Sequence, residues 1–179
     1  MLKRLKSLQY FFLPLLLFTP TQVLATYQIR DVLTVDEERH DIENVPLEAR
    51  FSREFIWERV APRTICSGNW RGYQAFWEII EGDLYVVSVI RDACSPGEIV
   101  SAKDLFSEEN YPVRADWYSG EIFSWTGRSW HDEVVQPDGS VDTTNYRYER
   151  IVFAIEEGML KESYVEVVDG EERVRLPGL

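Results

Sequence analysis

The stretch from Trp70 to Ile90 constrains the fold of this chain more than any other. Two runs rich in Trp, Tyr, Phe, Val and Ile flank a short turn at residues 81–83, and these residue types favour β-strands. Gly82, in the middle of that turn, can adopt the positive φ that a tight hairpin requires. The stretch therefore predicts a β-hairpin. A hairpin defines a scaffold, and it indicates no reaction or ligand.

Three more hairpins are expected after this central one. Apolar and polar residues alternate in their strands, as they do in strands that are buried on one face, and a Gly-containing turn separates the two runs of each pair. The pairs are 113–118 with 121–125, 130–135 with the region of Val141, and 146–155 with 159–168. We expect Gly82 and Gly158 to occupy equivalent turn positions with positive φ.

The rest of the chain contributes little helix. Residues 26–44 are expected to form a strand and a charged loop, Asn44 can cap a short helix that starts at Pro46, and Ser101 can cap one helical turn. Together these patterns predict a single, mainly β domain over residues 26–179. It is an antiparallel meander of hairpins that forms a small barrel or sandwich, with one or two short helices.

The first 25 residues have the layout of a secretory signal peptide. A basic start precedes an apolar run at residues 10–18, and cleavage is expected after Ala25. The apolar run is shorter than the roughly 20 residues that span a bilayer. The sequence therefore predicts a periplasmic or secreted protein that is free of the membrane after cleavage. An N-terminal anchor that is never cut is the alternative.

Cys66 and Cys94 are the two cysteines of the chain. They lie just outside the two strands of the central hairpin, so folding about Gly82 brings them to the same end. In an oxidising compartment such a pair forms a disulfide, which we therefore expect here. No metal site is expected, because neither a third Cys nor a nearby His completes a zinc ligand set.

The chain is strongly acidic. Loss of the signal peptide, which contains three basic residues and no acid, takes the formal net charge from −12 to −15. Such a surface repels nucleic acid and anionic membranes and attracts basic partners. Solvated charge that keeps the protein soluble and monomeric explains the same composition. The expected partner is a basic protein or peptide, or a saccharide, and not nucleic acid.

The common catalytic motifs are missing from the sequence. His40 and His131 have no metal-binding spacing, and there is no nucleophile elbow and no Gly-rich phosphate loop. No cofactor is expected. Glu78, Asp116 and Glu121 lie on aromatic-rich strands and could provide the two carboxylates of a glycosidase. However, no spacing selects a pair from the 31 acidic residues.

Aromatic residues are concentrated between residues 117 and 130. Strand alternation places some of them on the outer face, and exposed aromatic side chains beside acids bind sugars, peptides or proteins. Packing in the core is the competing interpretation, because large aromatic residues commonly fill small β-folds. The candidate binding residues are Trp117, Tyr118, Glu121, Trp125 and Trp130.

Four short motifs are W-R-G-Y at 70–73, W-E-I at 77–79, L-F at 105–106 and A-D-W-Y-S-G-E-I at 115–122. In these motifs the chain resembles a family of small, uncharacterised bacterial proteins, many of them exported. The resemblance covers about residues 46–160, and it implies an exported bacterial protein without implying a reaction. Within the first motif, Arg71 is expected to pair with an acid where Gly72 permits a close backbone approach.

These observations predict an exported, acidic, non-catalytic binding or interaction protein. An inhibitor or immunity protein for a cationic partner fits this description. One alternative is a carboxylate-dependent hydrolase that acts on saccharides, and another is a structural component of the envelope. A cleft with paired carboxylates would favour the enzyme, whereas an acidic patch with aromatic residues would favour the binding protein.

Overall fold

The computed structural model describes residues 27–170 and 172–176. The expected signal peptide lies outside these residues. The described elements, in chain order, are β1 (Asp31–Val35), β2 (Glu38–Ile42), the 3-10 helix η1 (Pro46–Ala49), α1 (Arg53–Val60), β3 (Tyr73–Ile80), β4 (Asp83–Arg91), β5 (Glu98–Ile99), α2 (Ala102–Phe106), β6 (Val113–Arg114), β7 (Gly120–Val135), β8 (Val141–Glu156), β9 (Met159–Asp169) and β10 (Glu172–Arg175).

The strands form a closed barrel, which confirms the mainly β prediction and decides between barrel and sandwich. Seven strands follow the order β9-β8-β7-β2-β1-β3-β4 around it, and β4 pairs with β9 to close the ring. β10 extends the sheet beyond β9, and the short strands β5 and β6 pair with β4. Closure satisfies the backbone groups that edge strands would otherwise leave free.

Two equivalent hairpin turns meet where the barrel closes. Glu81 and Gly82 have φ values of 52° and 87°, and Glu157 and Gly158 have values of 50° and 77°. This confirms the predicted positive φ at both glycines. The amide of Leu84 donates to the carbonyl of Gly158 at 2.7 Å, and the amide of Leu160 donates to that of Gly82 at 2.8 Å. The two turns therefore hold β4 and β9 together.

The simple meander is wrong in two places. β1 pairs with β3 in parallel, because the chain leaves β2, passes through η1 and α1, and returns on the other side of β1. The predicted hairpin of residues 113–118 with 121–125 does not form: β6 pairs with β4, whereas β7 pairs with β8 and β2. Alternation specifies which face of a strand is buried, but it does not specify the partner strand.

The N-terminal part also differs from the prediction. Residues 31–42 form the β1–β2 hairpin in place of a strand and a loop. The cap of η1 is Val45, because the side chain of Asn44 instead accepts a hydrogen bond from the amide of Phe123 at 2.7 Å. α1 was not predicted, and its first turn is capped by the Ser52 hydroxyl. The turn at 102–106 is helical, as expected. Ser101 is at its N-cap position, but its side chain makes no capping hydrogen bond.

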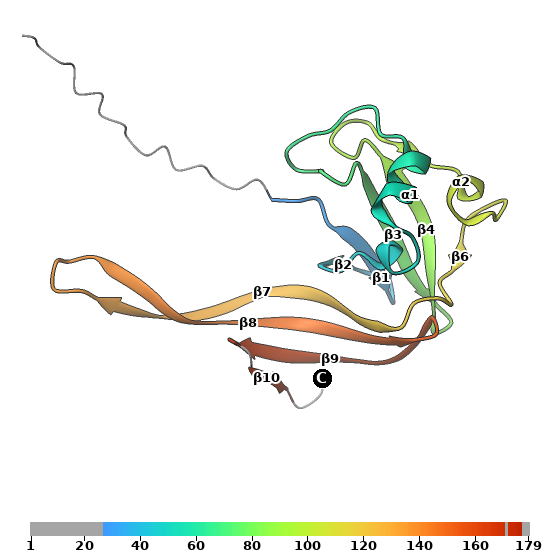
Figure 1. The fold of residues 1–179 in the computed structure, drawn as a ribbon. Helices are drawn as coiled ribbons and strands as arrows, with labels where there is room; N and C mark the ends of the chain where they lie inside the picture. Colours follow the sequence, from blue (N-terminus) through green and yellow to red (C-terminus); the bar gives the residue numbers. More distant parts are fainter. Residues whose placement is uncertain (1–26, 171, 177–179) are drawn as a thin grey trace, which may run out of the picture.

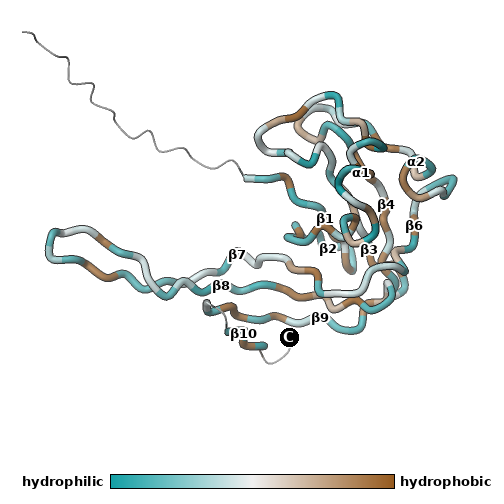
Figure 2. Tube along the Cα trace, viewed as in Figure 1, coloured by the Kyte–Doolittle hydropathy of each residue, from teal (hydrophilic) through white to brown (hydrophobic). Residues whose placement is uncertain are grey.

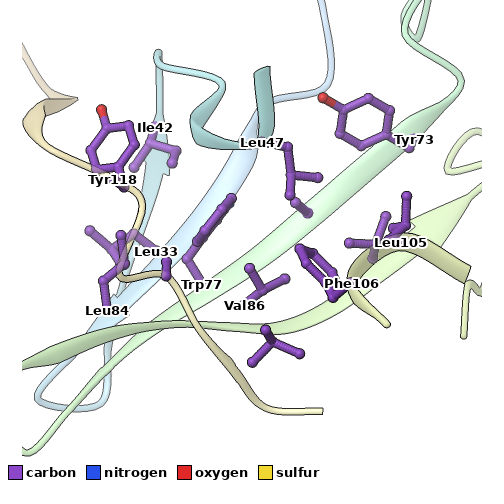
Figure 3. Packing of buried hydrophobic residues seen from close by; sticks show 14 of the residues in the cluster. Leu33, Ile42, Leu47, Tyr73, Trp77, Leu84, Val86, Leu105, Phe106 and Tyr118 are labelled. Carbon is purple, nitrogen blue, oxygen red and sulfur yellow. The ribbon is translucent and has the colours of Figure 1, made fainter. Parts of the chain in front are cut away.

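The core fills the barrel around Trp77, which is fully buried. Figure 3 shows its indole ring between Leu33 and Leu84 on one side and Leu47 on the other, with Val86 and Phe106 nearby. Side chains from η1, α1 and α2 belong to the same hydrophobic cluster as the strands. The helices therefore close the barrel core and do not form a separate layer.

The β7–β8 hairpin extends far beyond the barrel. β2 pairs with β7 at Ser124, and β9 pairs with β8 as far as Arg147. Residues 126–146, called the arm below, therefore extend past β2. Beyond Trp130 and Arg147, which face each other on β7 and β8, only these two strands remain. Figure 1 shows the arm projecting from the body on the side opposite α2, and in Figure 2 it is mainly hydrophilic with short hydrophobic segments. The predicted turn at 136–139 is at its tip.

Cys66 and Cys94 form the predicted disulfide, with their Cα atoms 6.4 Å apart. The bridge connects the loop before β3 to the loop after β4, at the open end of the central hairpin. In the part of the chain that the structure describes, no helix has the length and apolar character needed to cross a bilayer.

Candidate functional site

One of the predicted binding residues, Tyr118, lies in the core, and a second, Trp117, is partly buried against it. Trp117 stacks on Phe106 with 5.8 Å between ring centroids, and the guanidinium of Arg50 lies over its other side at 4.3 Å. Tyr118 is buried, its hydroxyl donates to the carbonyl of Glu121 at 3.2 Å, and burial raises its pKa. The packing interpretation therefore fits both residues: Tyr118 is buried, and the Trp117 ring is engaged by Phe106 and Arg50.

The other two predicted tryptophans lie on β7 and are exposed. Trp125, at the base of the arm, is 43% exposed, and Trp130, within the arm, is 44% exposed. The indole N–H of Trp125 donates to the carbonyl of Arg128 at 3.4 Å, which orients the ring against the strand. Large aromatic surfaces left in water are suited to contact with a ligand or a partner.

Two tyrosines of β8 join Trp125 in a recess that the sequence did not reveal. Trp125, Tyr146 and Tyr148 line a shallow recess of about 200 Å³ together with Arg30 and Glu43. The rings of Tyr146 and Tyr148 are 6.2 Å apart, and Arg30 forms an ion pair with Glu43 at 3.4 Å. We call these five residues the aromatic recess.

Register irregularities explain why the recess could not be predicted. Between Trp125 and Ser129, and again between Trp130 and Asp132, the β7–β8 pairing shifts. Each shift changes which side chains face each other across the strands. The alternation of Tyr146 and Tyr148 was visible in the sequence, but their position opposite β7 depended on these bulges.

Glu121 does not belong to the aromatic recess. Its carboxylate accepts a hydrogen bond from the Tyr164 hydroxyl at 3.0 Å and pairs with Arg173 at 3.6 Å. The other two candidate carboxylates are distributed elsewhere: Glu78 lies on β3, and Asp116 precedes β7. β2 and β1 separate β3 from β7 in the barrel order, so Glu78 and Glu121 lie on strands that are not neighbours.

The outer part of the arm is acidic. Residues 131–146 contain Asp132, Glu133, Asp138 and Asp142 and no Lys or Arg. Asp138 accepts hydrogen bonds from Ser140 in the tip turn, which lower its pKa. The outer arm therefore presents four acidic side chains on an exposed ribbon.

The W-R-G-Y segment surrounds a second polar centre. Asp31 is fully buried and accepts hydrogen bonds from Arg71 at 3.0 Å, from the amide of Ala75 at 3.1 Å and from the indole N–H of Trp77 at 3.3 Å. Burial raises the pKa of Asp31, and the charge of Arg71 opposes this shift. The predicted pairing of Arg71 with an acid is confirmed, and it anchors the segment to β1.

Among the described residues, no group of three or more His, Cys, Asp or Glu side chains has an arrangement that could hold a metal ion. Comparison of the chain with family models, with curated proteins and with solved structures finds no match. The resemblance in the short motifs therefore stays a prediction, and the arguments about function depend on the geometry described above.

Proposed function

We propose that this chain is an exported, non-catalytic binding protein that recognises a basic protein or peptide through its arm and the aromatic recess. The observation that carries the proposal is the arm itself, which leaves the barrel as two strands with exposed aromatic residues at its base and acids towards its tip. An isolated two-stranded hairpin is only marginally stable in water. Contact with a partner would stabilise the two strands of the arm.

Charge and aromatic surface have different roles in this proposal. The acids of the outer arm attract a basic partner from a distance and increase the association rate. Trp125, Trp130 and Tyr146 provide apolar contact area, which slows dissociation. Fast association through acidic residues and slow dissociation through aromatic residues would suit an inhibitor or immunity protein for a cationic partner.

The hydrolase alternative has less support. The candidate carboxylates are distributed over separate elements, and Glu121 is engaged by Tyr164 and Arg173. The barrel interior around Trp77 is filled by hydrophobic side chains. Glycoside hydrolysis requires two carboxylates that flank a substrate cleft, whereas Glu78, Asp116 and Glu121 lie on β3, in the turn before β7 and on β7 itself.

A truncated arm provides the test. Ser129 and Tyr148 are opposite each other on β7 and β8, so an Asn-Gly turn can replace residues 130–147 between them. Immobilised wild-type protein and the truncated chain are incubated with the same extract of exported proteins. We expect wild-type protein alone to retain a basic partner, and its association rate to fall about tenfold when salt is raised.

Two point variants test whether the exposed aromatic surface of the arm contributes to that binding. Trp130→Ala should speed dissociation, whereas the matched control Ile99→Ala, which removes an exposed apolar side chain from β5, should not. A partner that the truncated chain retains equally well would contradict the proposal. So would a partner whose association rate does not respond to salt.

A further inference from the structure

A second cavity lies under the W-R-G-Y segment, at a different place from the arm. It has a volume of about 160 Å³. This is smaller than the roughly 300–1,000 Å³ of sites for drug-sized ligands, so it fits a ligand with a single ring. The lining residues are Glu48, Arg53, Ile56, Trp57, Trp70, Arg71 and Tyr73.

Two exposed tryptophans contribute to this cavity. Trp70 is 70% exposed and Trp57 is 41% exposed. Gly72, with φ of +75°, makes room for Trp57, because a Cβ atom there would lie 3.3 Å from Cζ3 of that indole and 2.6 Å from Cγ of Pro62. The close backbone approach expected at Gly72 therefore fixes Trp57 against the segment that carries Trp70.

The inner part of the cavity has two unused hydrogen-bond donors. Tyr73 is 2% exposed, and neither its hydroxyl nor Nη1 of Arg71 has a hydrogen-bond partner among the described residues. The guanidinium carbon of Arg71 lies 5.0 Å from the centroid of the Tyr73 ring, and the nearby Arg71 side chain partly opposes the rise in the Tyr73 pKa that burial causes. Figure 3 shows this hydroxyl pointing away from Leu105 and Phe106 of the core.

Buried polar groups in native proteins nearly always have a partner. Burial also raises the pKa of Tyr73, so its hydroxyl keeps its proton at neutral pH. The Tyr73 hydroxyl oxygen and Nη1 of Arg71 are closed to solvent in this structure, so an acceptor in the cavity reaches them only when a neighbouring side chain shifts.

The charges around the cavity are already balanced. Arg53 pairs with Glu48 at 2.9 Å, and Arg71 pairs with Asp31 at 3.0 Å. An anion would have to compete with these carboxylates for both guanidinium groups. A neutral ligand with several hydroxyl groups can accept from Tyr73 and Arg71 and donate to Glu48, and the C–H face of a sugar ring suits the electron-rich face of an indole.

We propose that this cavity binds one pyranose unit of a neutral saccharide. The ring packs on Trp57 and Trp70, and its hydroxyl oxygens accept hydrogen bonds from the Tyr73 hydroxyl and Nη1 of Arg71. The site is independent of the arm, so the chain would have a saccharide site in addition to its protein-binding surface. W-R-G-Y then acts as a unit, because Trp70, Arg71 and Tyr73 contact the sugar and Gly72 positions Trp57.

The test uses full-length mature protein labelled with 5-fluorotryptophan. The six tryptophans are assigned in ¹⁹F NMR spectra by single Trp→Phe variants. Glucose, galactose, mannose and N-acetylglucosamine are titrated separately, with acetate and inorganic phosphate as anionic probes. We expect at least one sugar to shift the Trp57 and Trp70 signals saturably, while the Trp125 and Trp130 signals stay in place.

Variants then assign the contacts. Trp70→Ala should abolish the shift of Trp57, and its circular dichroism should match that of wild-type protein because Trp70 is largely exposed. Tyr73→Phe should weaken sugar affinity roughly threefold to tenfold, the usual effect of one hydrogen bond, without lowering the melting temperature. Tyr111→Phe is the matched control, because the hydroxyl of Tyr111 is also buried without a partner but lies outside this cavity.

Three results would overturn the proposal. The first is that none of the four sugars shifts the Trp57 or Trp70 signal. The second is that the shifts persist in Trp70→Ala. The third is that acetate or phosphate binds and the sugars do not, which would show an anion site. None of these results depends on the arm, so this proposal can fail while the proposed protein partner is still found.

Discussion

Gly82 and Gly158 have the same backbone conformation but different surroundings. A Cβ atom at Gly82 would meet nothing within 4 Å, whereas at Gly158 it would lie 2.8 Å from the carbonyl oxygen of Ala115 and 2.9 Å from Cα of Asp116. We expect Gly82→Ala to lower the free energy of unfolding by about 1 kcal/mol, the cost of positive φ. Gly158→Ala should lower the free energy of unfolding by about 1–3 kcal/mol more, because the backbone at Ala115 and Asp116 must move to make room for the new Cβ atom.

Urea denaturation of the two variants measures this difference. Gly127 provides the control, because it also has positive φ, at 84°, and open space around it, but it lies in the arm away from the barrel closure. Gly127→Ala should therefore resemble Gly82→Ala or cost less. Equal losses at Gly82 and Gly158 would mean that the contact between the β8–β9 turn and residues 115–116 does not constrain the barrel.

At the scale of elements, the arm is expected to be dispensable for folding. The residues that the truncation removes, 130–147, pair mainly with each other, and the barrel strands pair around the ring without them. The truncated chain described above should therefore lose less than about 1 kcal/mol of unfolding free energy, since exposed and locally paired segments contribute little to global stability. Urea denaturation followed by near-ultraviolet circular dichroism tests this.

Proteolysis of the wild-type protein provides a second measurement of the same property. Cleavage should begin near residues 136–140, at the exposed tip, and leave the barrel intact. If truncation instead unfolds the protein, the arm is part of the folding unit, and the loss of a partner in the binding test could not be attributed to recognition.

At the scale of the whole molecule, the disulfide connects two loops that flank the central hairpin. Cys66 and Cys94 are separated by 28 positions in the chain. A bridge that closes a loop of this size restricts the unfolded chain and stabilises by about 3–4 kcal/mol in the loop-entropy model. Replacing both residues by Ser should lower the melting temperature while keeping the barrel. In wild-type protein that is denatured without a reducing agent, a thiol reagent should label no cysteine. Two reactive thiols per chain would contradict the bridge.

Local features of the sequence determined much of this fold. The central hairpin, the last hairpin, the tip of the arm and both glycine turns were predictable, because period-two alternation and turn residues act over a few positions. The disulfide followed from the central hairpin, since the two cysteines flank it. The pairing of Arg71 with an acid was predictable from the close backbone approach that Gly72 permits, although Asp31 could not be named in advance.

Only the tertiary structure decided the pairings between distant segments. Alternation in residues 113–118 showed that one face is buried, but burial against β4 and burial in a hairpin produce the same pattern. The parallel β1–β3 pair and the contact between the two glycine turns join segments far apart in the chain, and no local signal encodes such pairing.

The same reason separates the predicted site from the observed one. Trp117 and Trp125 are the same residue type eight positions apart, yet one packs on Phe106 and the other is exposed at the base of the arm. The sequence by itself determined that aromatic residues would lie on strands of an acidic β-protein. Which of these aromatic residues face solvent depended on the bulges, on the strand order of the barrel and on the points where β2 and β9 end beside β7 and β8. Burial depends on neighbours in space, which the local sequence does not specify.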